Sequence, residues 1–586
     1  MSSSPSRAWR FLRESGAEGR RFLRSAAVRR AYGAWLGRVP EALVQAPRVL
    51  RAASGETLAF YLDRWAQRRP SEPALLSEGL CWSWFELAQR VAFAAHRFAD
   101  AGVTSGDVVA LTGASGPAYY VSLLGAMKLG ASAALMPSAA TDAGLRHGVS
   151  VSDARYVVGE VRARALFDAR TTLPFPNGRA ELAPSARRNV RETCVFIFTS
   201  GTTGLPKACP ITHGKASAAA IFAGASGWRY MPGDRLYNVL PLSHASGLLL
   251  GAFAALAHGV PMFVRPFSAS RFVDDAVRHR LTAFNYIGET ARYLIRSLNG
   301  HAPPNPLRVA MGNGLPRELW KPLRAGLGLD SIVEFYGATE APGGFINLSE
   351  EPGSIGHRSF PQLGLSRVVR EADGKLARRA GRVIECAAGE PGELILRLPP
   401  RALGSGALNA VFRGYTDEAA TEKKIVRDCF RAGDRYFRTG DRVVVDEQGF
   451  VRFVDRLGDG YRFKGENISA AEVEAEARAS IDAPCVVVGA ALPGVDGRVG
   501  VLVVEGEPSS KVLAALTDAA FAVHARPRFV RFVDAIPTTS TFKIRRAQLR
   551  DEGVGPSGDA FVWHGKGYEP LDASIYAAIC EGRRRL

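Results

Sequence analysis

The stretch that most constrains this chain is Thr199-Ser-Gly-Thr-Thr-Gly-Leu-Pro-Lys207. It follows an apolar, β-prone run, Cys194–Phe198, which predicts a buried strand. Glycines let backbone N–H groups approach an anion, hydroxyl groups add donors, and a lysine adds a positive charge. The pattern is neither GxxxxGK[ST] nor GxGxxG. We therefore interpret the stretch as a phosphate-binding loop of another kind, in preference to a Gly/Ser/Thr-rich surface turn.

The segments around this loop alternate between strand and helix patterns. We expect a strand at 107–111, a helix at 118–128, a strand at 131–136, and more of the same over some 400 residues. The apolar stretch Leu248–Val264 is interrupted by His258, Gly259 and Pro261, which favours a buried helix followed by a strand over a membrane helix. The fold class predicted for this part is α/β, with doubly wound parallel sheets.

After Gly440 the pattern changes. A hairpin is expected from 442–445 and 450–454, and Ser469 begins a capping-box pattern that predicts a helix. Strands at 485–488, 501–504 and 529–533 and a helix near 511–524 complete a small α+β domain. With 586 residues the chain is too long for one ordinary domain. We predict an arginine-rich lead-in at 1–51, a large domain at 52–455, and a smaller, mobile C-terminal domain at 456–586, with a hinge near 456–459.

Charge and cysteine content indicate which classes of partner and which redox compartment suit the chain. The net charge is +18, and 64 of the 75 basic residues are arginine. Such a balance suits anionic small molecules or acidic lipid surfaces. No zinc-finger, RNP or helix-turn-helix pattern is present, so we expect no nucleic-acid partner. The seven cysteines are scattered without a CxxC, which indicates a reducing compartment and neither a disulfide framework nor a zinc site.

The first 51 residues carry eleven arginines, three acidic residues and interleaved aromatic side chains, for a net charge of +8. A solvated helical segment packed on the main body is one interpretation. A peripheral helix on anionic lipid is another, and a transit peptide has a similar composition. We expect a cytoplasmic location, and the peripheral contact with the inner face of the membrane stays open.

Five further segments place polar side chains in loops or, for Asp455–Arg456, at the end of a strand. Taken alone, each has an ordinary structural explanation, such as a surface carboxylate, a common turn, an ion pair, a structural histidine or a solvated lysine. Taken together, they supply a metal ligand, a carboxylate for a ribose and several cations. The segments are Pro241–His244, Tyr336–Glu340, Arg438–Asp441, Asp455–Arg456 and Ile536–Lys543.

Their order along the chain resembles that of the adenylate-forming enzymes, which include acyl-CoA synthetases, luciferases and peptide-synthetase adenylation domains. More specific motifs resemble the branch of the fatty acid transport proteins and very-long-chain acyl-CoA synthetases, from about residue 55 to the C-terminus. These motifs are Pro266–Phe272, Tyr286–Glu289, Met311–Leu315, Glu334–Glu340, Gly458–Asn467 and Gly565–Leu571.

The resemblance implies roles for individual residues. The catalytic residues would be Lys543, His244, Glu340 and Thr339, with Glu340 also binding Mg²⁺. Lys543 would bridge the acyl carboxylate and the α-phosphate, and His244 would lie near the carboxylate. The β- and γ-phosphates of ATP would be held by Thr199, Ser200, Gly201, Thr202, Thr203, Gly204 and Lys207. The rest of the nucleotide and CoA site would comprise Gly312, Asn313, Gly314, Tyr336, Gly337, Asp441, Arg456, Lys464 and Gly465.

The resemblance also implies the reaction. A long- or very-long-chain fatty acid would react with ATP to give acyl-AMP and pyrophosphate, and CoA would then displace AMP. The substrates would be a fatty acid, ATP and CoA, with Mg²⁺. Two alternatives stay open: a ligase for another lipophilic acid, such as a bile acid or branched acid, and an uptake protein that acts by trapping fatty acid as its CoA ester.

Overall fold

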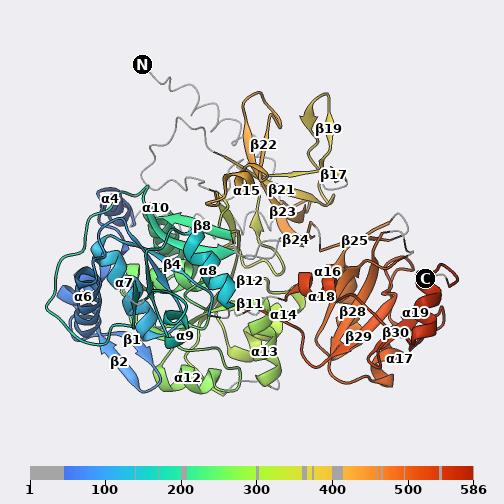
Figure 1. Cartoon of the computed structure of the whole chain (residues 1–586), viewed down its shortest axis with the longest axis horizontal. Coiled ribbons are helices and arrows are strands. Elements are labelled where there is room, and N and C mark those ends of the chain that lie inside the picture. Colours follow the sequence, from blue (N-terminus) through green and yellow to red (C-terminus); the bar gives the residue numbers. More distant parts are fainter. Residues whose placement is uncertain are drawn as a thin grey trace.

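The structure is a computed structural model that describes residues 45–138, 140–168, 171–199, 207–298, 303–358, 366–372, 375–398, 414–457, 459–463, 466–493, 495, 497–539, 544–584 and 586. Figure 1 shows a large part built from the first three quarters of the chain and a smaller part built from its C-terminal quarter. Helices and strands are mixed throughout, and the predicted α/β class is confirmed. The segment 1–44 lies outside the described residues, so its membrane contact stays a prediction.

The largest sheet runs through the lower half of the large part. Within the described residues it has eight strands, and those between its two edge strands are all parallel. The edge strands β2 and β14 pair antiparallel with their neighbours. In order across the sheet, the strands are β14 (Gly344–Asn347), β13 (Ser331–Gly337), β12 (Val309–Asn313), β11 (Ala283–Ile287), β9 (Leu236–Asn238), β10 (Met262–Val264), β1 (Pro73–Ser77) and β2 (Leu80–Ser83).

A second sheet carries the predicted phosphate-binding loop. The expected strand at Cys194–Phe198 is confirmed as β7 (Thr193–Thr199), which pairs with the antiparallel β8 (Lys207–Thr212). The expected strands at 107–111 and 131–136 are confirmed as β3 and β4, which pair parallel to each other in this sheet. In order, the described strands are β6 (Thr172–Leu173), β5 (Tyr156–Val158), β3 (Val108–Leu111), β4 (Ser132–Leu135), β7 and β8.

Helices cover these sheets, and local sequence signals set their ends. Ser83 and Glu86 form a capping box at the start of α6, and Gly130, at φ +83°, ends α7. The helices are α4 (Ala46–Ala53), α5 (Leu58–Arg68), α6 (Trp84–Asp100), α7 (Pro117–Leu129), α8 (Asp142–Val151), α9 (Val161–Arg164), α10 (His213–Phe222), η1 (Ala223–Trp228), η2 (Ser246–Ala252), α11 (Phe253–His258), α12 (Phe272–His279), α13 (Gly288–Leu298) and α14 (Arg317–Leu327).

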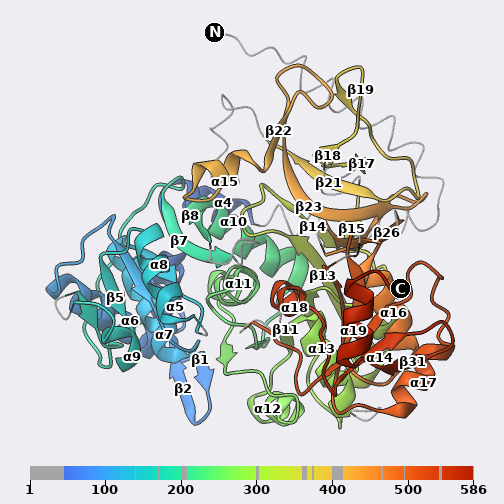
Figure 2. The same cartoon turned by 45° about the vertical axis from the view of Figure 1, so that its right-hand side comes forward.

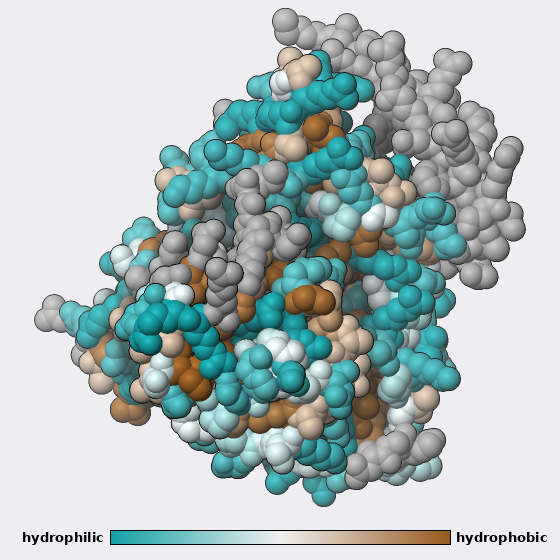
Figure 3. Space-filling view, turned by 90° about the vertical axis from the view of Figure 1, so that its right-hand side faces the viewer, coloured by the Kyte–Doolittle hydropathy of each residue, from teal (hydrophilic) through white to brown (hydrophobic). Residues whose placement is uncertain are grey.

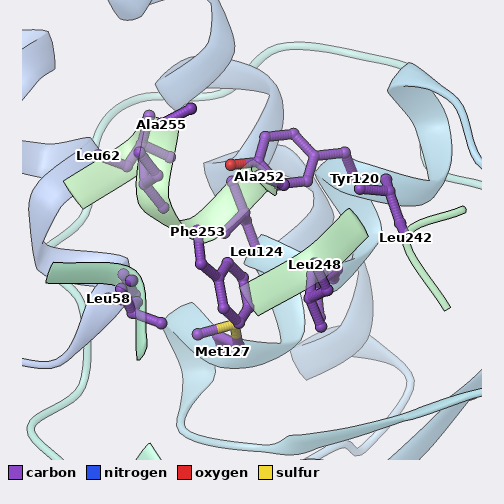
Figure 4. Packing of buried hydrophobic residues seen from close by; sticks show 14 of the residues in the cluster. Leu58, Leu62, Tyr120, Leu124, Met127, Leu242, Leu248, Ala252, Phe253 and Ala255 are labelled. Atoms are coloured by element: carbon purple, nitrogen blue, oxygen red, sulfur yellow. The ribbon is translucent and has the colours of Figure 1, made fainter. Parts of the chain in front are cut away.

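One apolar core joins the two sheets. Figure 4 shows Leu58 and Leu62 of α5 beside Leu124 and Met127 of α7 and Phe253 of α11, and all five are buried in the same cluster. The apolar stretch Leu248–Val264 therefore serves the core, as predicted, although its first part is the π-helix η2. No helix among the described residues is long and apolar enough to cross a membrane.

A third sheet, seen at the top of Figure 1, was not predicted. All its described pairings are antiparallel, so the expectation of doubly wound sheets alone was incomplete. The predicted hairpin is confirmed at its centre, with a longer first strand. The described strands are β15 (Gly356–His357), β16 (Ser366–Val369), β21 (Gly392–Arg397), β22 (Ile425–Arg427), β23 (Arg435–Val445) and β24 (Phe450–Arg456), beside the short pairs β17 (Glu371–Ala372) with β18 (Lys375–Leu376) and β19 (Arg378–Arg379) with β20 (Arg382–Val383).

The C-terminal part has its own hydrophobic core, from Tyr461 to Ile579, as expected for a small α+β domain. The helix expected at 511–524 ends earlier, at Asp518. Figure 2 shows this part beside α13 and α14 of the large part. Its elements are β25 (Tyr461–Phe463), β26 (Glu466–Ile468), α16 (Ala470–Ser480), β27 (Cys485–Ala490), β28 (Val499–Glu505), α17 (Ser510–Asp518), β29 (Phe529–Val533), α18 (Arg546–Glu552), β30 (Ala560–Trp563), β31 (Tyr568–Pro570) and α19 (Ala573–Cys580).

Contacts at the predicted domain boundary tie the two parts together. Asp455, at the end of β24, is buried, and its Oδ2 accepts hydrogen bonds from Ser469 Oγ at 3.3 Å and Ala470 N at 3.1 Å. A carboxylate of the large part thus caps helix α16 of the small part. Whether segment 456–459 acts as a hinge stays a prediction, and Gly458 lies outside the described residues.

The end of the molecule formed by the small part is mostly hydrophilic. Figure 3 shows hydrophilic side chains over most of this face, with apolar ones between them.

All seven cysteines lie within the described residues and are free. The sequence predicted no disulfide framework.

Candidate active site

The two ends of the predicted phosphate-binding loop lie side by side. Thr199 ends β7 and Lys207 begins β8, and the two residues are partners in the antiparallel register. Residues 200–206 lie outside the described residues, so the roles of Ser200, Gly201, Thr202, Thr203 and Gly204 stay predictions. The flanking strands hold one hydroxyl and one cation at the mouth of the loop.

Tyr415 joins this loop to the predicted metal ligand. The Lys207 ammonium lies 5.3 Å from the centre of the Tyr415 ring, within the range of a cation–π contact. The Tyr415 hydroxyl donates a hydrogen bond of 2.7 Å to Glu340 Oε1. Burial, followed by the charge of Glu340, raises the pKa of Tyr415, so the phenol stays a donor at neutral pH. Lys207 and Glu340 are thus linked through Tyr415, and their shared role in one site stays a prediction.

Glu340 lies in a turn that a second lysine holds. Ala341 N donates to Ala338 O at 3.0 Å, which makes Thr339 and Glu340 the central residues of a β-turn. Lys215, on α10, donates from Nζ to Thr339 O at 2.7 Å and to Ala341 O at 3.0 Å. Burial lowers the pKa of Lys215. Both residues predicted in this loop are therefore fixed by backbone contacts on either side of them.

A second carboxylate, Asp441, is the one predicted to bind the ribose. Tyr336, on β13, donates its hydroxyl to Asp441 Oδ2 at 2.5 Å. Asp441 and Arg456 are paired across β23 and β24, and Arg456 Nε lies 3.3 Å from Asp441 Oδ1. Asp441 is buried, whereas the Arg456 side chain is 61% exposed. The arginine can therefore approach a bound anion while the carboxylate stays in place.

The end of β12 carries Gly312, Asn313 and Gly314, which were predicted to bind adenine. Gly312 is in register with Tyr286 on one side and Glu334 on the other. A Cβ at Gly312 would come within 2.2 Å of the Tyr286 carbonyl oxygen, so only glycine fits there. Gly314 has φ +76°, which favours glycine in the same way. The strand end is therefore specified by its two glycines.

Asn313, between these glycines, tests whether the site fits a nucleotide. Its Oδ1 is buried and has no hydrogen-bond partner. A buried acceptor without a donor is costly, and a ligand N–H would satisfy it. The exocyclic amino group of adenine is such a donor. The residues present therefore fit the nucleotide that the sequence predicts.

Two buried side chains, Tyr286 and Glu334, lie on the strands either side of this strand end. Glu334 accepts a hydrogen bond of 2.5 Å from the Tyr286 hydroxyl and one of 2.9 Å from Leu315 N. Burial raises the pKa of Glu334 to about 8. The carboxyl group therefore holds a proton in the folded state at pH values where the unfolded chain has released it.

This raised pKa predicts a loss of stability with rising pH. Below about pH 4 the Glu334 carboxyl is protonated in both states, and between there and pH 8 only the folded state keeps the proton. Stability should fall by up to about 1.4 kcal/mol per pH unit across that window. Glu334→Gln should flatten the profile, measured as the unfolding temperature at pH 5.5, 6.5 and 7.5. The exposed Glu318→Gln is the control, and an unchanged slope in Glu334→Gln would contradict the prediction.

His244 lies in the loop before η2. Its backbone N donates to Pro241 O at 3.1 Å, and its ring Nδ1 accepts from Ser246 N at 3.3 Å. Because Nδ1 accepts, a neutral ring carries its proton on Nε2. The histidine can therefore donate a hydrogen bond from Nε2, as a partner of an acyl carboxylate requires.

Three predicted residues of the small part lie outside the described residues: Lys464, Gly465 and Lys543. The flanks of Lys543 are described, and Thr538 and Ile544 form a β-bridge. Both line a cavity of about 210 Å³ between the two parts, together with Glu289 and Tyr293 of α13. The segment that carries Lys543 thus begins and ends at the interface with the large part.

Among the described residues, Thr199 pairs with Lys207, and Tyr415 links Lys207 to Glu340. Tyr336, Asp441 and Arg456 form a second set of contacts. The catalytic roles of all predicted residues stay predictions.

Sequence reasoning missed Tyr415, Lys215 and the pair Tyr286–Glu334. Neither Gly414-Tyr415 nor Lys215 at the start of α10 belongs to a motif with a characteristic spacing. Within the described residues no group of three or more His, Cys, Asp or Glu side chains could hold a metal. One carboxylate beside substrate phosphates is instead typical of Mg²⁺.

Comparison with known proteins agrees with this geometry. Residues 62–416, more than half of the chain, match the family described as AMP-binding enzyme. The chain belongs to the AMP-binding enzyme family. The predicted enzyme class, an AMP-forming ligase, is thereby confirmed.

Within this family, similar proteins include long-chain fatty acid transport protein 1 of Rattus norvegicus, 32% identical over 90% of this chain and 88% of that protein. Another is the medium/long-chain-fatty-acid–CoA ligase FadD6 of Mycobacterium tuberculosis, 34% identical over 82% of this chain and 84% of that protein. The resemblance to the fatty acid transport protein branch is confirmed over nearly the whole chain.

Solved structures of the family share the fold. ATP-bound MatB from Rhodopseudomonas palustris has a TM-score of 0.70 and 22% identity, and covers 84% of this chain and 98% of its own. The o-succinylbenzoate CoA synthetase MenE from Bacillus subtilis, with its acyl-adenylate OSB-AMP, has a TM-score of 0.68 and 23% identity over 84% of this chain and 98% of its own. The predicted arrangement of a large N-terminal and a small C-terminal domain is confirmed at the level of the fold.

The contacts of Asp441 predict a specific kinetic effect. Asp441→Ala should raise the KM for ATP about 10-fold or more with a smaller change in kcat, because it removes an acceptor worth about 1.5–3 kcal/mol to a hydroxyl donor. Initial rates of pyrophosphate release at varied ATP would measure this. Asp446→Ala, a carboxylate in the turn between β23 and β24, is the control. A change in kcat alone would contradict a ribose-binding role.

Proposed function

We propose that this protein is an ATP-dependent ligase that joins a long- or very-long-chain fatty acid to CoA through an acyl-AMP intermediate. Support comes from relatives named as fatty acid transport proteins and as a fatty-acid–CoA ligase. The alignments with this chain cover most of their length. The observation that carries the proposal is the connected network of Lys207, Tyr415 and Glu340 beside Tyr336 and Asp441. It offers a cation and a hard ligand for a triphosphate beside a carboxylate for a ribose.

The first step joins two anions, the fatty acid carboxylate and the α-phosphate. The carboxylate oxygen forms a bond to phosphorus, and pyrophosphate leaves. Thr199 and Lys207 would neutralise the leaving pyrophosphate, and Asp441 would hold the ribose hydroxyl groups. Glu340 would hold Mg²⁺, which supplies charge compensation on the phosphates. His244 and Lys543 would fix the carboxylate for attack.

In the second step the sulfur of CoA attacks the acyl carbon, and AMP leaves with the bonding electrons. The segment with Lys464 and Gly465 would face this half-reaction after a rotation of the small domain. The thiol proton leaves to solvent or base, and no redox change occurs. A basic chain of net charge +18 suits two nucleotide substrates.

Pyrophosphate release by the purified protein tests the proposal. The assay would contain ATP and Mg²⁺ with medium- to very-long-chain fatty acids and one bile acid, each with and without CoA. CoA-dependent turnover that peaks at long chains is expected. Turnover that peaks with the bile acid or a branched acid would replace the substrate class. No turnover with any acid would overturn the ligase.

The uptake alternative is separable from the ligase. If uptake depends on trapping the acid as its CoA ester, a Lys543→Ala protein should lose fatty acid uptake in cells along with ligation. Uptake that persists in Lys543→Ala would instead show transport independent of ligation.

A further inference from the structure

Lys215 is a cation close to the site that the proposed reaction does not use. It lies in the first turn of α10, where its backbone N–H is capped by Thr212 Oγ1 at 3.2 Å. Its side chain leaves the helix and reaches the loop after β13, more than 120 residues further along the chain. The contact therefore joins α10, the helix that follows β8, to the loop that carries Glu340.

The two hydrogen bonds of Lys215 lie on either side of Glu340. Its ammonium binds the carbonyl oxygens of Thr339 and Ala341, at 2.7 and 3.0 Å. The turn is already closed by the backbone bond from Ala341 to Ala338. The lysine therefore adds something that turn formation does not need, because it fixes the carbonyl groups of the residues immediately before and after Glu340.

The Glu340 side chain is held from the opposite side. Tyr415 donates to one carboxylate oxygen, which leaves the other oxygen for a ligand. The charge of Lys215 also acts on Glu340 through space. A partly buried ammonium is expensive to desolvate, so its two hydrogen bonds to carbonyls offset that cost and add little net stability. The arrangement is thus better suited to orienting a carboxylate than to stability.

We propose that Lys215 is a positioning residue for the adenylation step. It holds the turn Ala338–Ala341 so that Glu340 and Thr339 face the magnesium nucleotide, and it touches no substrate itself. The inference rests on the proposed role of Glu340. It adds a third lysine to those that the adenylation step requires, distinct from Lys207 and Lys543.

The test is the Mg²⁺ dependence of pyrophosphate release by the full-length protein. Lys215→Met should raise the Mg²⁺ concentration for half-maximal rate about 10- to 100-fold, the usual effect of losing a residue that orients a metal ligand. Lys215→Arg keeps donors for the two carbonyls and should recover at least part of this loss. In Lys215→Ala, propylamine should restore activity, whereas tetramethylammonium, which has no N–H donor, should not.

Lys128→Met is the matched control. Lys128 is a buried lysine on α7 that binds Asp63 at 2.6 Å, so its loss destabilises the fold away from the site. It should lower the unfolding temperature without changing the half-saturating Mg²⁺ concentration. An unchanged Mg²⁺ dependence in Lys215→Met, or an equal shift in Lys128→Met, would overturn the proposal. If Glu340→Gln itself leaves the Mg²⁺ dependence unchanged, the assignment of Glu340 fails, and the role of Lys215 with it.

Discussion

Lys543→Ala is expected to lower the rate of acyl-AMP formation by about 10²- to 10³-fold, the effect of removing one fixed donor that stabilises developing charge. Thioester formation from supplied acyl-AMP should be largely unchanged. The reason is that only the first step brings the carboxylate and the α-phosphate together, and only this step needs a cation between them. Pyrophosphate release measures the first half-reaction, and acyl-CoA formed from synthetic acyl-AMP measures the second.

The described flanks of Lys543 lie at the interface between the two parts. Thr538 and Ile544 bridge to each other and line the cavity there together with residues of α13. Lys511→Ala removes an exposed lysine of the same small part and should change neither half-reaction. An equal loss of both half-reactions in Lys543→Ala would contradict the assigned role.

Glu340→Gln should reduce kcat/KM for magnesium ATP by about 10²-fold and raise the Mg²⁺ concentration needed for half-maximal rate. Glutamine has the same shape and still accepts from Tyr415, so the change isolates the charge of the carboxylate. A neutral amide oxygen is a weaker ligand for a hard cation than a carboxylate. Titration of the initial rate with Mg²⁺ at saturating ATP and acid gives the measurement.

Glu418→Gln is the control for this variant. Glu418 begins α15 (Glu418–Glu422), close in sequence to Tyr415, and is exposed. Its removal changes the net charge equally and should leave the Mg²⁺ titration unchanged. A Glu340→Gln protein with a lower kcat but a normal Mg²⁺ titration would show that Glu340 acts through positioning of the turn and not as the metal ligand.

The sequence predicted the site best where local chemistry and strand ends coincide. The strand before Thr199 and the loop after β13 were predicted, because β-prone runs followed by glycine and polar residues carry that information locally. Asp441 was expected in a loop ahead of the hairpin, and this was wrong, because residues 438–441 belong to the long first strand β23. Tyr415 was missed because its partner Glu340 lies 75 residues away and nothing in the spacing connects them. Such pairings depend on tertiary structure alone.

The fold was predicted less completely between residues 356 and 456. The strands there include several of two to four residues, and they pair antiparallel in a sheet of their own. Short strands give too few residues for a period of two to be recognised, so they resemble loops in the sequence. The helix expected at 511–524 was predicted too long, because apolar residues continue past Asp518 and pack into the core without forming helix.

The cap that Asp455 provides for α16 sets an energetic bias on any rotation of the small domain. Two hydrogen bonds to a carboxylate, at 3.3 and 3.1 Å, would have to break before the small domain could turn about segment 456–459. At about 1 kcal/mol net each, they would shift the conformational equilibrium constant about 30-fold toward the described orientation. Formation of acyl-AMP and departure of pyrophosphate would have to reverse that bias. The relative speed of the two half-reactions could then be tuned at a single carboxylate outside the residues proposed to bind the fatty acid, ATP or CoA.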